Sequence, residues 1–269
     1  MRLSVRHRSE YGYEPAAARV SLRLKLFPSV YDGQSVEGWT VTVNGDPVEP
    51  IYITGYGDET ALWQSEGAVS RVEVLANGVV ATQDKSGVVR DLPKKPPSSI
   101  FLRDTDLTRP DEAIRALAQA ARKEDQLETT HALSLAVREA IDYRPEATTA
   151  TTTAAEAMAI GAGVCQDHSH VLISACRALD IPARYVTGYL KAADDEDELL
   201  ETHAWVEAHI QHFGWVGLDP SNGISPTDHY IRIACGLDAD DATPIKGHVV
   251  GGSQITLSAD VAVSDNQQQ

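Results

Sequence analysis

Apolar and polar residues alternate along three stretches in the first third of the chain. The segments 18–29, 38–50 and 70–83 read "ARVSLRLKLFPS", "GWTVTVNGDPVEP" and "SRVEVLANGVVATQ". A period of two indicates strands with one buried face, and the Asn-Gly pairs in the last two segments predict tight hairpin turns. We therefore expect a small β-sandwich domain over residues 1–92.

The pattern changes after a proline-rich segment. Residues 91–99 read "DLPKKPPSS", and three prolines in nine residues can continue neither a ladder nor a helix. This predicts a linker over 93–109 and a second domain over 110–269. That domain opens with apolar residues at helical spacing behind an expected N-cap, Asp111. They are Ile114, Leu117, Ala118 and Ala121.

The second domain is predicted to run from helices into antiparallel strands, which makes the fold α+β. Further amphipathic helices are expected over 129–143, 151–161, closed by Gly161, and 165–179. Strands are expected over 181–190, 202–210 and 213–220. The segment between the first two of these strands, "KAADDEDELLE" at 191–201, carries too much like charge to enter a core, so we expect a solvated loop.

Composition places the chain among ordinary globular proteins, with 42% hydrophobic and 23% charged residues. The first residues lack the apolar region of a signal peptide, and no apolar run approaches the ~18 residues of a membrane span. A cytoplasmic location is therefore expected. The three cysteines show no CxxC pairing and are an odd number, so we expect thiols rather than a disulfide framework.

The net charge of -16 is concentrated in the second part of the chain. Residues 1–110 hold 13 Lys+Arg against 14 Asp+Glu, and the remainder holds 10 against 25. A negative field repels phosphate backbones and anionic lipid, so neither nucleic acid nor a membrane surface is expected as a partner. Cationic or amine-bearing substrates would be attracted.

One cysteine is placed differently from the other two. Cys165, in "GAGVCQDHSH", follows two glycines and directly precedes a predicted helix, where unpaired N–H groups and the helix dipole favour a thiolate. Cys176 and Cys235 lie inside a predicted helix and a strand-like segment, and we expect them to pack in the core. Taken alone, Cys165 would also more often be a structural thiol.

Two further residues complete a catalytic set with Cys165. His203, in "THAWVEAHI", and Asp219, in "WVGLDPSNG", each lie at one end of a predicted strand. An imidazole can take the proton of the thiol, and a carboxylate on its far ring nitrogen fixes the tautomer. The order Cys, His, Asp therefore predicts a nucleophile, a base and the residue that orients the base.

These segments resemble the bacterial transglutaminase-like cysteine hydrolases. The resemblance rests on "GVCQDHSHVLISACRALDIPARYVTGYL", "THAWVEAHI" and "WVGLDPSNG", and extends to "HYIRIACGLDADDATPIKG" and to the strand-rich first domain. It implies an N-terminal β-sandwich followed by a papain-like, transglutaminase-like core. It also implies Cys165 as nucleophile, His203 as base and Asp219 as orienting residue, with no cofactor and a peptide or protein substrate.

The oxyanion donors are only partly assigned by the sequence. No tryptophan lies between the linker and Cys165, so the tryptophan donor of animal cross-linking transglutaminases has no counterpart. The backbone N–H of Cys165 can serve as one donor, and either Gln166 or Tyr143 could provide the second.

A metal site is the weaker alternative for the same residues. Cys165, His168, His170 and His203 are ligand types, but His168 and His170 would point about 160° apart on a helix. We therefore expect no metal, and a structural or supporting role for His170.

The sequence thus predicts thiol-dependent acyl transfer, with hydrolysis of a peptide or isopeptide bond as the first choice. Amine transfer is the alternative within the same chemistry. A catalytically idle peptide-binding module is the alternative outside it, although all three residue types of the triad are present.

Overall fold

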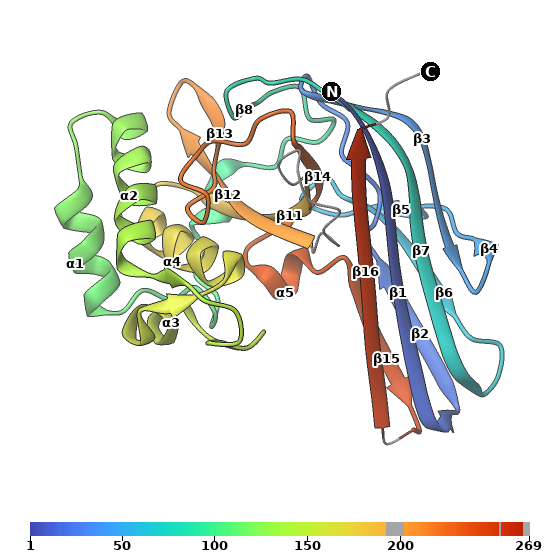
Figure 1. Cartoon of the computed structure of the whole chain (residues 1–269). Coiled ribbons are helices and arrows are strands. Elements are labelled where there is room, and N and C mark those ends of the chain that lie inside the picture. The colour runs from blue at the N-terminus through green and yellow to red at the C-terminus, as the bar shows by residue number, and fades with distance from the viewer. Residues whose placement is uncertain (192–201, 253, 266–269) are drawn as a thin grey trace.

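The computed structural model describes residues 1–191, 202–252 and 254–265, and its fold is α+β as predicted. A central sheet lies between a group of helices and a β-sandwich (Figure 1). The predicted loop over 191–201 falls almost wholly outside the described residues. Among those residues, no helix is both long and apolar enough to cross a bilayer.

The sandwich is built from two antiparallel sheets with a shared apolar core. The first sheet has the order β16-β1-β7-β3-β4 and the second β15-β2-β6-β5. Their bounds are β1 Arg2–Ala17, β2 Arg19–Leu24, β3 Gln34–Val43, β4 Asp46–Pro47, β5 Tyr52–Ile53, β6 Glu59–Gln64, β7 Val69–Thr82, β15 Ile245–Val250 and β16 Gln254–Asp265. Alternate residues of β1, β2 and β7 are buried, as the period-two pattern predicts.

The central sheet has the order β14-β11-β12-β13-β8, and the helices pack against it. The strands are β8 Val88–Val89, β11 Ala183–Leu190, β12 Thr202–Ile210, β13 Gly214–Leu218 and β14 Tyr230–Gly236. A short two-stranded pair, β9 Asp142–Tyr143 with β10 Ala162–Gly163, lies beside the helices. The helical elements are η1 Ser98–Leu102, α1 Glu112–Ala121, α2 Gln126–Ala140, α3 Ala154–Ile160, α4 Cys165–Ala178 and α5 Ala239–Ala242.

The predicted helix ends are confirmed by their capping contacts. The Asp111 carboxylate accepts a hydrogen bond from the backbone N–H of Ile114 at 2.8 Å and so begins α1. Gly161 ends α3 in the left-handed conformation, with φ 69°, which costs glycine little.

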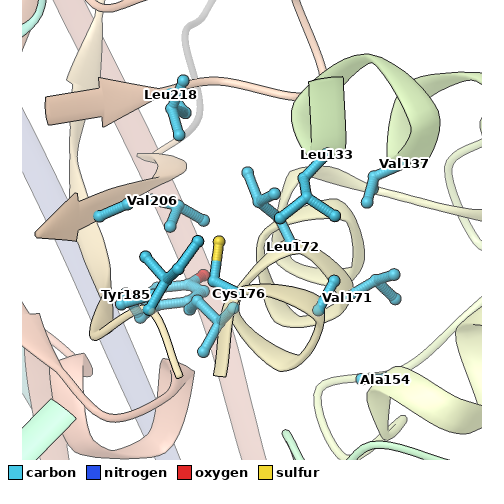
Figure 2. Close-up of a cluster of buried hydrophobic side chains, with 14 of the residues drawn as sticks. Leu133, Val137, Ala154, Val171, Leu172, Cys176, Tyr185, Val206 and Leu218 are labelled. Carbon is cyan, nitrogen blue, oxygen red and sulfur yellow. The ribbon is translucent and has the colours of Figure 1, made fainter. Parts of the chain in front are cut away.

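Helix α4 is buried on nearly every side, because α1, α2 and α3 cover it and the central sheet supports it. Cys176 lies in this core among apolar side chains, near Tyr185 of β11 and Leu172 of α4 (Figure 2). Cys235 of β14 is also fully buried. The expectation that both cysteines serve packing is confirmed.

The predicted domain boundaries need correction at two places. The chain returns to the sandwich after the central sheet, since β15 pairs with β2 and β16 pairs with β1, so the second domain does not extend through 110–269. Within the predicted 1–92 domain, β8 joins the central sheet by pairing with β13. An edge strand of each sandwich sheet thus comes from the far end of the chain.

Only one of the two predicted Asn-Gly turns exists. Asn44 and Gly45 both have positive φ and connect β3 to β4. Asn77 and Gly78 instead continue β7 without a turn. A Cβ on Gly78 would lie 2.1 Å from the carbonyl oxygen of Gly38, so this glycine permits the close approach of β3.

Candidate active site

Cys165 is the first residue of α4 and is partly exposed. The preceding peptide is fixed by Asp167, whose Oδ2 accepts hydrogen bonds from the backbone N–H of Val164 at 2.8 Å and from the Thr148 hydroxyl at 2.6 Å. A Cβ on Gly163 would meet the Asp167 side chain at 2.6 Å, so only glycine fits this turn. The glycine-rich approach therefore serves to present the sulfur at a helix N-terminus.

His203 lies near the start of β12 and faces both Cys165 and Asp219. Its Nε2 lies 2.7 Å from Oδ2 of Asp219, which follows directly after β13. Burial lowers the pKa of His203, but hydrogen bonds to Asp219 and Cys165, with the charges of both, outweigh it and raise the pKa to about 9. With Nε2 bound to Asp219, Nδ1 is the nitrogen left for the sulfur. The structure brings the three predicted residues together.

Asp219 is fully buried and its two oxygens are held by five donors. Oδ2 accepts from His203, from Asn222 Nδ2 at 2.7 Å and from the Tyr230 hydroxyl at 2.8 Å. Oδ1 accepts from the backbone N–H groups of Ser221 at 2.9 Å and Asn222 at 3.2 Å. Although burial raises its pKa, these hydrogen bonds and His203 lower it below the usual range, so Asp219 is an anion at neutral pH.

Aromatic rings cover the imidazole of His203. Trp205, two residues further along β12, stacks with it at a ring distance of 6.3 Å, and Tyr230 of β14 packs edge-on at 6.0 Å. The two rings limit the orientations that the imidazole can adopt and exclude water from one side of the His203–Asp219 pair.

The two predicted candidates for the second oxyanion donor have different surroundings. Gln166 Nε2 donates a hydrogen bond to the carbonyl of Ala150 at 3.2 Å, which occupies one of its two N–H groups. Tyr143 is exposed, stacks on His168 and lies in β9, opposite Gly163 of β10. Both residues therefore lie close to the start of α4, and the choice between them stays a prediction.

His170 has a structural environment. It is fully buried, its Nε2 accepts the backbone N–H of Ala239 at 3.0 Å, and its ring packs on Tyr185 at 5.3 Å. Burial, with a smaller contribution from Arg177, lowers its pKa to about 3, so the imidazole is neutral. It links α4 to the start of α5.

The residues of the metal alternative do not converge. Both ring nitrogens of His168 face backbone carbonyls, of Val164 at 3.0 Å and Ile141 at 2.9 Å, while His170 meets Ala239. In the part of the chain that the structure describes, no three His, Cys, Asp or Glu side chains are grouped so as to hold an ion.

Four further residues belong to the site but were not predicted as parts of it: Asn222, Tyr230, Trp205 and Asp167. Asn222 follows Asp219 by three residues, a spacing typical of a local side-chain turn, and Trp205 shares a strand face with His203. These two had a readable signal. Tyr230 follows Asp219 by 11 residues and reaches it only in the folded chain, which local sequence does not indicate.

Models of known protein families match both parts of the chain. Residues 115–220 match the model of the transglutaminase-like superfamily, and residues 3–81 match that of the bacterial transglutaminase-like N-terminal region. An uncharacterised protein of Mycobacterium leprae is 26% identical over 98% of both chains. An uncharacterised protein of Mycobacterium tuberculosis is 35% identical over 132 residues, which are 44% of this chain and 42% of that one.

A solved structure has the same fold. The crystal structure described as "a Putative Cysteine Protease from Cytophaga hutchinsonii" aligns with a TM-score of 0.76 over 100% of this chain and 92% of that one, at 20% identity. At 20% identity this similarity is evidence of a shared fold alone, and it covers both the sandwich and the core.

Proposed function

We propose that this chain, which belongs to the transglutaminase-like superfamily, is a thiol-dependent acyl-transfer enzyme that acts on peptide or isopeptide amides. One observation carries the proposal. Cys165, at the N-terminus of α4, lies close enough to His203 to help raise the pKa of that histidine, and His203 is oriented by the buried Asp219 at 2.7 Å. Acyl-transfer catalysis by a thiol uses a nucleophile, a base and a carboxylate that orients the base, and the three residues lie next to one another in that order.

The reaction divides into two steps. The Cys165 thiolate attacks the amide carbonyl, and the His203 imidazolium gives its proton to the leaving amine as the C–N bond breaks, which leaves a thioester. Neutral His203 then takes a proton from the water that attacks the thioester, and the carboxylic acid leaves as Cys165 is released. The backbone N–H of Cys165 points from the helix start and can stabilise the oxyanion in both steps.

Hydrolysis is the first choice, and amine transfer is the second. The acidity of residues 111–269 favours the approach of an amine-bearing molecule, which could resolve the thioester in place of water. The two reactions are distinguished by the product, since an added primary amine becomes covalently attached only in the second. The cytoplasmic location expected from the sequence remains part of the proposal.

The decisive experiment traps the acyl-enzyme. The protein is incubated with a peptide library, quenched in acid and weighed, and peptide mapping assigns the adduct. We expect a thioester on Cys165 and none in Cys165→Ala, whose melting temperature should stay within a few degrees of the native protein. Turnover in Cys165→Ala equal to that of the native protein would end the proposal.

A second experiment distinguishes the enzyme from an idle binding module without a substrate. Iodoacetamide at about pH 6 should label Cys165 faster in the native protein than in His203→Ala, because the raised pKa of His203 keeps an imidazolium beside the sulfur. Cys176 and Cys235 are internal controls, since burial raises their pKa to about 12 and about 11. Equal labelling of Cys165 in both proteins would favour the binding module.

A further inference from the structure

A cavity of about 420 Å³ lies between residues 89–98 and the turn that joins β12 to β13. We call it the linker cavity. Its lining includes four cations and two exposed or half-exposed aromatic rings: Arg90, Lys94, Lys95, Arg184, Phe213 and Trp215. His209 also lines it and lies six residues beyond His203 along β12, about 20 Å away. The linker cavity is therefore separate from the candidate active site.

The buried charges beside this cavity do not balance. Arg184 and Arg232 are both buried and share a single carboxylate, Glu207, whose oxygens lie 2.6 Å and 2.9 Å from their Nε atoms. The next carboxylate, Asp58, pairs with the buried Lys25 at 3.1 Å. Three buried cations thus face two buried anions, and a buried charge without a partner is costly.

Of these three cations, Arg184 is the one that lines the linker cavity. Its side chain is 1% exposed, and its second terminal nitrogen, Nη2, has no hydrogen-bond partner among the described residues. The guanidinium lies over the ring of Trp215 at 3.9 Å, which offsets part of its charge. A guanidinium has five donors in a fork that matches carboxylate and phosphate oxygens.

The rim of the linker cavity adds further positive charge at the surface. Arg90 is exposed and lies over the ring of Phe213 at 5.9 Å. Lys95 is exposed and only loosely paired with Asp91, at 3.9 Å. The lining of the linker cavity has four cations and one carboxylate. It is therefore locally positive, although the chain has a net charge of -16.

We propose that the linker cavity binds a small organic anion. Its carboxylate or phosphate group would meet Arg184 and the cations of the rim, while its apolar body would lie against Phe213 and Trp215. The volume is that of a small-molecule site. The proposal does not depend on the reaction at Cys165, so it can be tested on the resting protein.

Calorimetric titration of the full chain with phosphate, benzoate and acetate tests the proposal, with ionic strength matched by sodium chloride. We expect saturable binding of phosphate or benzoate at concentrations up to about 10 mM and none of chloride. Benzoate binding more tightly than acetate would assign a role to the aromatic walls. Phosphate binding without benzoate binding would assign the site to a phosphate-bearing ligand.

The rim supplies a variant that should fold. In Arg90→Met/Lys95→Met we expect the affinity for the bound probe to fall about tenfold or more, as charge-assisted contacts are lost. Arg115→Met, an exposed single change on α1, is the control for loss of a surface cation elsewhere and should bind as the native protein does. Arg184→Lys, which keeps the charge but not the fork, should weaken binding further. Absence of saturable binding, or equal affinity in the rim variant, would overturn the proposal.

Discussion

Asp219 is the most constrained side chain of the candidate site, because His203, Asn222 and Tyr230 all donate to its Oδ2. Asp219→Asn should keep the fold but lower kcat by as much as ~10⁴-fold, since an amide can leave the imidazole in the wrong tautomer. Tyr230→Phe, which removes one donor of three and keeps the ring, is the graded control and should lose much less. A near-normal rate in Asp219→Asn would mean that another group orients His203.

The raised pKa of His203 also predicts a pH-dependent stability. Its pKa is about 9 in the folded protein against 6.5 for an ordinary histidine, so the protonated form stabilises the fold. This contribution is fully present below pH 6.5 and is lost as the pH rises through 9. The free energy of unfolding, measured in urea across this window, should fall more in the native protein than in His203→Gln, by at most about 3 kcal/mol. Parallel curves would contradict the coupling.

The reacting residues could be predicted from the sequence, but most of the residues that hold them in place could not. Cys165, His203 and Asp219 stand at element ends, where turn glycines, strand patterns and an Asp-Pro pair are readable locally. Tyr230 and Asp167 act through contacts that depend on how β14 and the start of α4 pack. A buried tyrosine or aspartate has no local sign that distinguishes support of a catalytic group from ordinary packing.

At the scale of elements, one buried arginine joins α4 to its surroundings. Arg177 donates to the carbonyls of Phe101, Ala183 and Leu237 and to the hydroxyl of Thr108, at 2.7 to 3.0 Å. It thereby ties the linker and β11 to α4, the helix that presents Cys165. The segment 93–109, expected as a plain linker, is held to the core in this way, and Phe101 is fully buried.

Arg177→Met should therefore destabilise the protein by about 3 kcal/mol, because it leaves four buried acceptors without their donor. Urea denaturation followed by circular dichroism measures the loss. Arg115→Met, on the exposed face of α1, is the control and should change stability by less than about 0.5 kcal/mol. A loss in Arg177→Met as small as that of the control would mean that water replaces these contacts.

The helices and strands that could be predicted are those whose sequence pattern is local. Helix α1 with its Asp111 cap, α3 with Gly161, and strands β11 to β13 followed from periodicity and capping chemistry. The pair Asn77–Gly78 wrongly predicted a hairpin turn. An Asn-Gly pair suits such a turn, but a glycine also suits a strand that a neighbouring strand approaches closely, and at Gly78 that neighbour is β3. The return of β15 and β16 to the sandwich is a matter of sheet pairing, which alternation alone does not assign.

At the scale of the whole molecule, sandwich and core share one interior. An apolar cluster joins β1, β7 and β16 to β11 and β14, with Leu3, Val80 and Val261 packed near Tyr189 and Ile231. Buried polar contacts cross the same boundary, among them His7 Nδ1 with the Tyr189 hydroxyl at 2.8 Å. Since the chain also crosses between the two parts at β8 and β15, we infer that they unfold together.

The buried pair of Lys25 and Asp58 tests this inference, because both residues belong to the sandwich yet each contacts the core. Lys25 Nζ donates to the carbonyl of Asp241, and Asp58 accepts from the backbone N–H of Cys235 at 3.1 Å. Asp58→Asn keeps the shape but leaves the Lys25 charge without its anion, which should cost about 3 kcal/mol and lower the melting temperature by roughly 10 °C. Calorimetry should give a single transition in both proteins, shifted as a whole in the variant, with the exposed change Asp106→Asn as control. Two transitions, of which Asp58→Asn moves only one, would mean that the sandwich and the core unfold independently.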